Sequence, residues 1–429
     1  MKNFKMKYGK IKMNVPVKEE NLLREIEGNP FEVTKTVDEI ITDALHNPIG
    51  SSRLKDIVKE GETVCLVIPD ITRGWQQTPK FLPEIIRELN EGGIKDEDIV
   101  IISAAGSHRK QTKEEHEMLI GKELIERFDV LDHDCFDKDN LVFVGETSFG
   151  NKIHVNKKAV ECDHIVLAGG IVYHFLAGWS GGRKSILPGI VSYDTIMKNH
   201  ELSLSKTLGE GKNKEAGGGK LKGNPVHEDM MEASAFVKPS FIFNVIMEPN
   251  GNIGAAVAGD YIKAHIEGCK IVESIDGVYI DQKADLAIAT AGGYPKDINL
   301  YQASKTLMNA REAVKEGGTI IVLSQCSEGL GGNADVQHIL LNFDNLLDRE
   351  KDLREKYSIS KDIAYIICDI ADKFDVILVS DIDSNLLKKA NITAVKTIEE
   401  ALEITYKQKG ENLKTYVMTH GANTFPTLK

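Results

Sequence analysis

Residues 64–70 of the chain read VCLVIPD, a short apolar run that ends in a polar residue, and a helical pattern follows at Phe81–Asn90. Apolar strands that alternate with helices are typical of an α/β fold with largely parallel sheets flanked by helices. Ligands of such sheets bind at the carboxyl ends of the strands, so the polar residues after each run are the first candidates for chemistry. Similar runs are Ile99–Ser103, Ile165–Leu167, Leu286–Thr290, Thr319–Leu323, Val376–Val379 and Tyr416–Thr419.

The length of 429 residues predicts two domains. The strand–glycine–helix pattern restarts after residues 273–284, so we expect an N-terminal α/β domain over 1–275 and a C-terminal Rossmann-like α/β domain over 276–429. The Gly- and Lys-rich segment Gly209–Lys222 predicts a mobile loop.

The composition excludes several classes of partner. A net charge of -12 without a basic stretch disfavours nucleic acids and membrane surfaces as partners. No run approaches the ~20 apolar residues of a membrane span, and the N-terminus lacks the apolar segment of a signal peptide. The six cysteines include no Cys-x-x-Cys pair, which leaves zinc-ribbon, iron–sulfur and thioredoxin sites unsupported. We therefore predict a cytoplasmic protein with free thiols.

The richest stretch, residues 173–185, reads YHFLAGWSGGRKS. A turn such as Gly181–Gly182 exposes backbone N–H groups that can receive a phosphate, and Lys184 adds positive charge. The spacing rules out a P-loop, because glycine must precede the lysine and Arg183 stands there. The alternative is a structural turn with a surface lysine.

Two histidines bracket Lys184, with His174 ten residues before it and His200 sixteen residues after it. A lone Gly-Gly-x-Lys turn is more often structural than functional. Imidazoles suit metal binding or proton transfer, so the flanking histidines favour a functional site.

Two further clusters follow the first two strands. In Asp70–Arg73, Asp70 and Thr72 can simply cap the next helix, whereas the planar guanidinium of Arg73 suits a carboxylate or phosphate. His108 follows Gly106 and Ser107, and a single histidine at a strand end is more often structural than catalytic.

The fourth cluster follows the run Leu286–Thr290, where Gly-Gly again ends a strand. Gln302 and Lys305 lie three residues apart, so they share one helix face if a helix starts near Asn299. A solvated helix face is the alternative interpretation.

Together, and in this order, the four clusters resemble the nickel-pincer lactate racemase family from about Asp70 to Lys305. The motif His-x(9)-Lys-x(15)-His, with Ser-Gly-Gly-x-Lys and Pro-Gly inside it, is highly specific. The resemblance implies a pyridinium-3-thioamide-5-thiocarboxylate mononucleotide that is attached covalently through a thioamide at Lys184. It also implies that this pincer holds nickel and that His200 completes a roughly square-planar metal site, a geometry that suits nickel.

The same resemblance assigns the remaining candidates. His108 and His174 match the paired acid/base histidines, while Arg73 and Lys305 would hold the substrate carboxylate and steady developing charge. Further cofactor contacts are expected from Asp70, Thr72, Gly181, Gly182, Tyr301 and Gln302.

The implied activity is racemisation or epimerisation of a 2-hydroxy acid. Hydride leaves the carbinol carbon for the cofactor, a planar 2-keto acid forms, and the hydride returns to either face. No side chain can hold a hydride, so a cofactor must, and inversion needs a base on each side. The resemblance also implies an active site in the cleft between the two domains and separate enzymes that mature the cofactor.

One turn departs from the family pattern, because residues 74–79 read GWQQTP. Trp75 either shapes the substrate pocket or packs under the turn, which leaves lactate open against larger 2-hydroxy acids such as malate, phenyllactate or sugar acids. Two other functions remain as alternatives. One is a nucleotide-dependent 2-hydroxy-acid dehydrogenase, for which no convincing G-x-G-x-x-G turn is found. The other is a nickel- or anion-binding protein without turnover.

Overall fold

The structure is a computed structural model that describes all 429 residues, and the chain divides into two compact units. The N-terminal unit consists of residues 30–203 and 214–275, and the C-terminal unit consists of residues 1–29, 204–213 and 276–429. The last boundary falls at Asp276, but two earlier segments join the C-terminal unit, which a single division near residue 275 does not include. One reason is that strand β3 (Leu22–Glu25) pairs with β19 (Thr415–Met418) at the edge of the C-terminal sheet.

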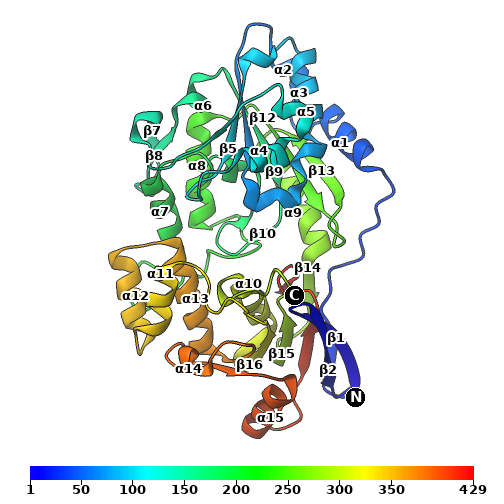
Figure 1. The fold of residues 1–429 in the computed structure, drawn as a ribbon, viewed down its shortest axis with the longest axis vertical. Helices are drawn as coiled ribbons and strands as arrows, with labels where there is room; N and C mark the ends of the chain where they lie inside the picture. The colour runs from blue at the N-terminus through cyan, green and yellow to red at the C-terminus, as the bar shows by residue number, and fades with distance from the viewer. The chain divides into compact units, whose positions relative to one another are not determined.

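The N-terminal unit is built on a six-stranded sheet in the order β13-β12-β9-β4-β5-β6. All neighbours are parallel except β12 and β13. Every residue of β4 is buried, as expected for a strand covered on both faces. Figure 1 shows the helices that flank this sheet. The strands are β4 (Val64–Pro69), β5 (Ile99–Ala104), β6 (Val130–Asp132), β9 (His164–Gly170), β12 (Phe241–Met247) and β13 (Ile253–Gly259).

The helices of this unit follow the apolar periodicity of the sequence. Helix α3 buries Leu82, Ile85, Ile86 and Leu89 on one face. Helices α4 and α5 are separated by Gly121, whose φ is +86°. The helices are α1 (Val37–His46), α2 (Leu54–Ile57), α3 (Leu82–Glu91), α4 (Lys113–Ile120), α5 (Lys122–Ile125), α6 (Lys157–Glu161), α7 (Tyr193–Glu201), α8 (Pro225–Val237) and α9 (Lys263–Asp276), and the two hairpins are β7 (Leu141–Glu146) with β8 (Lys152–Asn156) and β10 (Tyr173–His174) with β11 (Gly178–Trp179).

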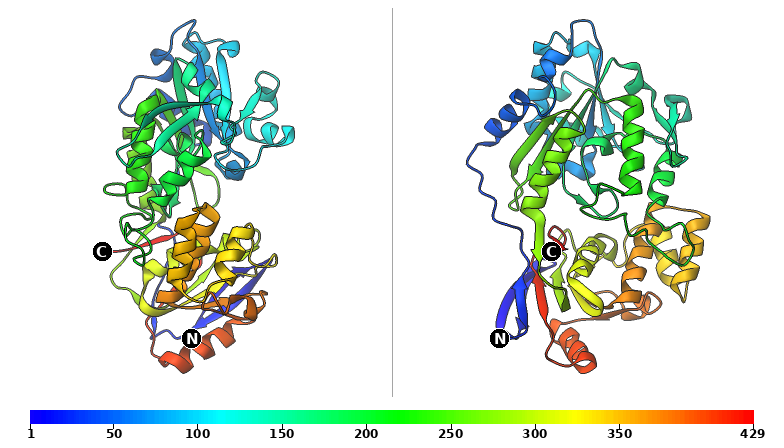
Figure 2. Two further views of the ribbon diagram at one scale, coloured as in Figure 1. Left: turned by 90° about the vertical axis from the view of Figure 1, so that its left-hand side faces the viewer. Right: turned by 180° about the vertical axis from the view of Figure 1, so that it is seen from behind.

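The C-terminal unit contains a second six-stranded sheet, in the order β18-β17-β16-β15-β19-β3, with all neighbours parallel. Figure 2 shows from two further sides that helices flank the sheet of each unit. In addition to β3 and β19, its elements are β1 (Lys2–Tyr8), β2 (Ile11–Val17), β14 (Gly277–Ile280), β15 (Ala284–Thr290), α10 (Leu300–Ala310), β16 (Val314–Leu323), α11 (Ala334–Leu341), α12 (Leu346–Glu355), α13 (Ile359–Lys373), β17 (Asp375–Val379), α14 (Ser384–Leu387), β18 (Ile392–Val395), α15 (Ile398–Lys409) and β20 (Phe425–Leu428).

Each sheet has a point where the strand order reverses. In the N-terminal unit the chain passes from β4 to β5 and β6 on one side, and β9 later pairs with β4 on the other side. In the C-terminal unit, β15 lies between β16 and β19. Ligands of open α/β sheets bind beside the carboxyl ends of the strands at such points. The segments after β4, β9 and β15 are therefore the expected positions of a bound ligand.

The first part of the predicted mobile loop is anchored to the C-terminal unit. The ammonium of Lys212 lies 2.6 Å from the carboxylate of Asp362, and both side chains are largely buried. Arg354 donates a hydrogen bond to the carbonyl of Ser205 at 2.8 Å. Ser205 and Lys212 are therefore bonded to the C-terminal unit, and the mobility of Gly209–Lys222 stays a prediction. No helix of the protein is long and apolar enough to cross a membrane.

Candidate active site

Three neighbouring strands of the N-terminal unit bring most of the candidate residues to one edge of the sheet. Asp70 follows β4, His108 follows β5, and the segment with His174 and Lys184 follows β9. Because β4 pairs with both β5 and β9, the segments after their carboxyl ends are neighbours. The sheet order therefore places three of the four sequence clusters together.

His108 is oriented by Asp70. The ring Nδ1 of His108 lies 2.5 Å from Oδ2 of Asp70, and Thr72 Oγ1 donates to Oδ1 at 2.6 Å. An ionised carboxylate only accepts hydrogen bonds, so Nδ1 carries the proton and Nε2 carries the lone pair. Burial raises the pKa of Asp70, but the hydrogen bonds from His108 and Thr72 outweigh that effect, and the pKa is lowered.

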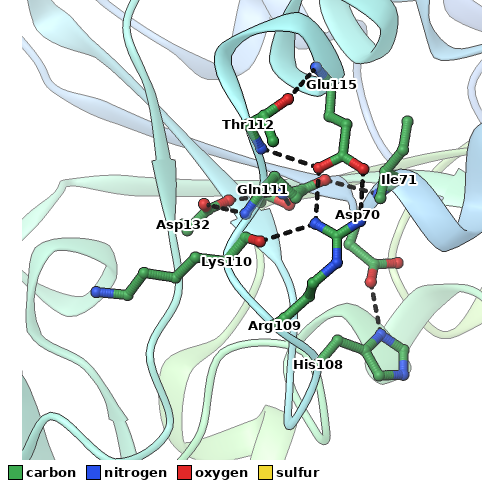
Figure 3. A network of polar contacts seen from close by, with 10 residues as sticks. Asp70, Ile71, His108, Arg109, Lys110, Gln111, Thr112, Glu115 and Asp132 are labelled. Carbon is green, nitrogen blue, oxygen red and sulfur yellow. Dashed lines mark hydrogen bonds and ion pairs between the residues drawn. The ribbon is translucent and has the colours of Figure 1, made fainter.

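The loop that carries His108 is fixed by its own polar contacts, which Figure 3 shows at close range. Arg109 forms two hydrogen bonds with the carboxylate of Glu115, at 2.8 and 2.6 Å. The amide of Gln111 accepts from the backbone N–H of Ile71 and donates to Asp132. These contacts join the loop after β5 to the segment after β4, so the side chains of His108 and Asp70 are kept next to each other.

Arg73 and Trp75 lie on the short 3₁₀ segment η1 (Ile71–Gln76). Arg73 donates to Thr72 Oγ1 at 3.1 Å, and its charge contributes to lowering the pKa values of both His174 and Lys184. Trp75 is 40% exposed, so part of its surface is accessible and part is covered. Both interpretations of Trp75, shaping the substrate pocket and packing under the turn, stay open.

His174 and Lys184 contact each other directly. His174 lies on β10, which pairs with β11 in a short hairpin, and its Nε2 is 3.0 Å from Nζ of Lys184. Burial holds the pKa of His174 well below its usual value, and a positive charge on Lys184 would lower it further. Burial, with the charges of Arg183 and Arg73, likewise holds the pKa of Lys184 well below its usual range.

The glycine turn is built around a buried arginine. Arg183 is 1% exposed, donates to the carbonyls of Ala177 and Gly181, and contacts His265 Nε2 at 2.8 Å. Burial lowers its pKa to about 10. Gly182 has a φ of +51°, and its N–H donates to Asn244 Oδ1 at 2.9 Å. That N–H group is therefore partnered within the protein, which the sequence expectation of a phosphate cradle did not include.

His200 lies in the last turn of α7 and is 4% exposed. Its Nδ1–H donates to the carbonyl of Ile196 at 3.0 Å, which leaves the lone pair on Nε2. This arrangement is the usual one for a metal-binding imidazole. No group of three or more His, Cys, Asp or Glu residues could hold a metal ion by itself.

Helix α7 is fixed by a buried carboxylate that sequence reasoning missed. Asp229 on α8 is completely buried and accepts hydrogen bonds from Thr147 Oγ1 at 2.6 Å and from the amides of Asn151 and Asn199 at 2.8 Å. Asn199 directly precedes His200. No local signal in the sequence marks Asp229, because its partners come from distant segments.

The fourth cluster lies in the C-terminal unit. Helix α10 begins after Asn299, whose side chain accepts from the N–H of Gln302 at 2.9 Å, so the condition under which Gln302 and Lys305 share one helix face is met. Gln302 and Lys305 are both exposed, and Tyr301 is partly buried, which raises its pKa. The segment follows β15, where the strand order of that sheet reverses.

Family models for the lactate racemase N-terminal domain and the lactate racemase C-terminal domain match residues 8–211 and 280–425. A lactate racemase from Thermoanaerobacterium thermosaccharolyticum is 33% identical over 440 residues, which cover 99% of each chain. A lactate racemase from Lactiplantibacillus plantarum is 34% identical over 395 residues, which cover 89% of each chain.

Two solved structures are similar to this one. The lactate racemase apoprotein from T. thermosaccharolyticum superposes with a TM-score of 0.90 at 32% identity, over 99% of this chain and 100% of that one. A protein from Thermotoga maritima superposes with a TM-score of 0.65 at 19% identity, over 94% of this chain and 100% of that one, which supports the fold alone.

Proposed function

The chain belongs to the lactate racemase family, so we propose that it interconverts the two enantiomers of lactate or of a larger 2-hydroxy acid. Family membership makes the protein an isomerase. The observation that supports the proposal most strongly is that Asp70, His108, His174 and Lys184 follow the carboxyl ends of the three adjacent strands β4, β5 and β9.

The residues present fit the family's nickel–pincer nucleotide. Lys184 offers an amine that contacts His174 and lies among positive charges, and His200 offers an imidazole lone pair on Nε2. We assign covalent attachment to Lys184 and nickel ligation to His200, with further contacts from Asp70, Thr72, Gly181, Gly182, Tyr301 and Gln302. When bound, this cofactor supplies a hydride acceptor that returns the hydride to either face of the substrate carbon.

The side chains supply the proton transfers and the binding of charge. Removal of hydride from the carbinol carbon requires a base for the hydroxyl proton, and His108 has its lone pair on Nε2 for that purpose because Asp70 holds its Nδ1–H. His174 is the second acid/base group. Arg73 and Lys305 bind the substrate carboxylate, for which a guanidinium and an ammonium are suited.

We also propose that other enzymes supply the cofactor and that the protein lies in the cytoplasm. A covalently attached nucleotide requires separate maturation enzymes. All six cysteines are free thiols, which fits a reducing cytoplasm.

The attachment site is tested by intact-protein and peptide mass spectrometry of matured protein. We expect the nucleotide adduct on the peptide that contains Lys184 and no adduct on a Lys184→Ala protein matured in the same way. Lys198→Ala is the matched control, since Lys198 is exposed and pairs only with Glu201. An adduct that persists in the Lys184→Ala protein would refute the assignment.

The reaction is tested with a panel of single-enantiomer 2-hydroxy acids and the nickel-loaded protein, with chiral chromatography of the product. The panel includes lactate, malate and phenyllactate, because Trp75 is exposed two residues after Arg73. Appearance of the opposite enantiomer without added NAD supports the racemase. Turnover that requires NAD would favour a dehydrogenase, and nickel binding without turnover of any acid would favour a binding protein.

A further inference from the structure

The hydrogen bonds of His174 determine which tautomer its imidazole ring adopts. Nδ1 lies 3.2 Å from the backbone nitrogens of both Leu176 and Ala177, whose N–H groups donate to it. A ring nitrogen that accepts hydrogen bonds carries no proton, so the neutral imidazole carries its proton on Nε2. Turning the ring over would set a C–H group against these two N–H groups, so the backbone of the hairpin determines the tautomer.

This tautomer constrains Lys184, because the ring Nε2 that carries the proton is the atom 3.0 Å from Nζ. An ammonium group has three donors and no acceptor, so it cannot receive a hydrogen bond from an N–H group. An uncharged amine has a lone pair and can. The contact is therefore a hydrogen bond only when Lys184 is a neutral amine.

The charges around Lys184 agree with this assignment. Lys184 is partly buried and its hydrogen-bond partner is an imidazole, whereas the largely buried Lys212 is paired with the carboxylate of Asp362. Arg183 on η5 (Gly182–Ser185) and Arg73 on η1 are the charged neighbours of Lys184, and both are positive. Burial without a counter-ion penalises an ammonium, and the two arginines add repulsion. His200 on α7 is the remaining titratable neighbour of His174.

We propose that His174 holds Lys184 as an uncharged amine, the nucleophile for covalent attachment of the cofactor. His174 thereby serves cofactor loading in addition to its proposed part in proton transfer. This inference rests on the proposed attachment at Lys184. An ammonium has no lone pair with which to attack, so the protonation state of this lysine decides whether loading can begin.

The attachment step balances without an oxidant or a reductant. The amine nitrogen attacks the carbonyl carbon of a thiocarboxyl group on the incoming pyridinium mononucleotide, so that a C–N bond forms and the C–O bond breaks. The oxygen leaves as water with one proton from the amine and one from the thiocarboxyl group. The product is the thioamide.

The test measures the reactivity of Lys184 against pH in the full-length protein, produced without the maturation enzymes. Brief pulses of acetic anhydride at pH 7, 8 and 9 are followed by peptide mass spectrometry, and the exposed Lys198 serves as the internal reference. An ordinary lysine, with a pKa of about 10.4, gains about tenfold more neutral amine with each pH unit in this range. We expect the labelling rate of Lys184 to change by less than about twofold from pH 7 to 9, while that of an ordinary lysine rises about 100-fold.

A Lys184 that follows the same steep rise would overturn the proposal, and so would a Lys184 that stays unlabelled at every pH. The pH profile is measured before any cofactor is bound. The result for Lys184 is therefore independent of whether the matured protein racemises a 2-hydroxy acid.

A pair of variants tests the part played by His174. His174→Glu places a carboxylate, which only accepts, beside Lys184, so we expect the labelling rate at pH 7 to fall at least tenfold and the profile to become steep. His154→Glu is the matched control, since His154 lies on β8 and packs at a tilt against Phe143, and its profile should stay flat. A flat profile in folded His174→Glu would remove the histidine from this role. If that variant does not fold, the profile of the unaltered protein still decides the state of Lys184.

Discussion

A single carboxylate determines what His108 can do. The hydrogen bonds with His108 and Thr72 hold the pKa of Asp70 below its usual value despite its burial. The carboxylate therefore remains a hydrogen-bond acceptor at neutral pH. The proton of His108 is thereby placed on Nδ1 and the basic lone pair on Nε2. The cofactor contact expected of Asp70 stays a prediction, and the structure adds a hydrogen bond between Asp70 and His108.

We predict that Asp70→Asn lowers the kcat for racemisation about 100-fold, because general acid–base catalysis contributes about 10²- to 10⁴-fold and an amide does not enforce the required tautomer. The KM should change much less, since Asp70 does not bind the substrate in this mechanism. The measurement is steady-state kinetics of the loaded enzyme with chiral detection. Thr72→Val removes the other hydrogen bond of Asp70 and should cost less than tenfold. Full activity of Asp70→Asn would show that Asp70 does not orient the base.

At the scale of elements, helix α7 is a support for His200. The carboxylate of Asp229 on α8 bonds to Asn199 on α7 and, through Thr147 and Asn151, to the turn between β7 and β8. Asn151 also donates to the carbonyl of Thr195 in α7. Three elements therefore meet at one buried carboxylate, next to the metal-binding candidate.

We predict that Asp229→Ala lowers the free energy of unfolding by about 3 kcal/mol, because each buried donor left without a partner costs about 1–3 kcal/mol. The amides of residues 193–201 should also exchange hydrogen faster in the unloaded protein, as measured by mass spectrometry. Thr147→Val is the matched control, since it removes one bond of the same carboxylate and leaves Asn199 bonded. It should cost about 1 kcal/mol and leave exchange in α7 unchanged. Equal acceleration in both variants would contradict a specific support of α7.

At the scale of the whole molecule, buried histidines make stability depend on pH. Burial lowers the pKa of His133, His174, His227 and His265 in the N-terminal unit, and that of His227 falls to about 3. In the unfolded chain a histidine has a pKa of about 6.5. The unfolded state therefore binds more protons below that pH. The contribution of these neutral histidines to the free energy of unfolding is present above about pH 6.5 and is lost progressively as the pH falls below that value.

We predict that His227→Gln reduces the loss of stability between pH 7.5 and pH 5.5 by about 1 kcal/mol, because a pKa shift of one unit is worth about 1.4 kcal/mol. The measurement is guanidinium denaturation at the two pH values, and only the difference between them is compared. His154→Gln serves as the control and should leave the difference unchanged. A pH difference in His227→Gln equal to that of the unaltered protein would refute the assignment of this histidine as a buried neutral group.

The sequence by itself determined the elements and the chemistry they could carry. Apolar runs such as residues 64–70 predicted strands, because a strand covered on both faces needs apolar side chains at every position, and the structure confirms β4, β5, β9, β15, β16, β17 and β19. The interpretation of Gln302 and Lys305 as one helix face assumed a helix from about Asn299, and α10 begins there. Motif spacing excluded a P-loop and identified the family, which the matching family models confirm.

Only the tertiary structure decided which of those residues meet. The order of strands depends on pairings between distant segments, and it set β4 between β5 and β9 and added β3 to the C-terminal sheet. The state of an ionisable group depends on its partners in space. That is why Asp70 beside His108, His174 beside Lys184, and Asp229 beneath α7 could not be read from sequence neighbours.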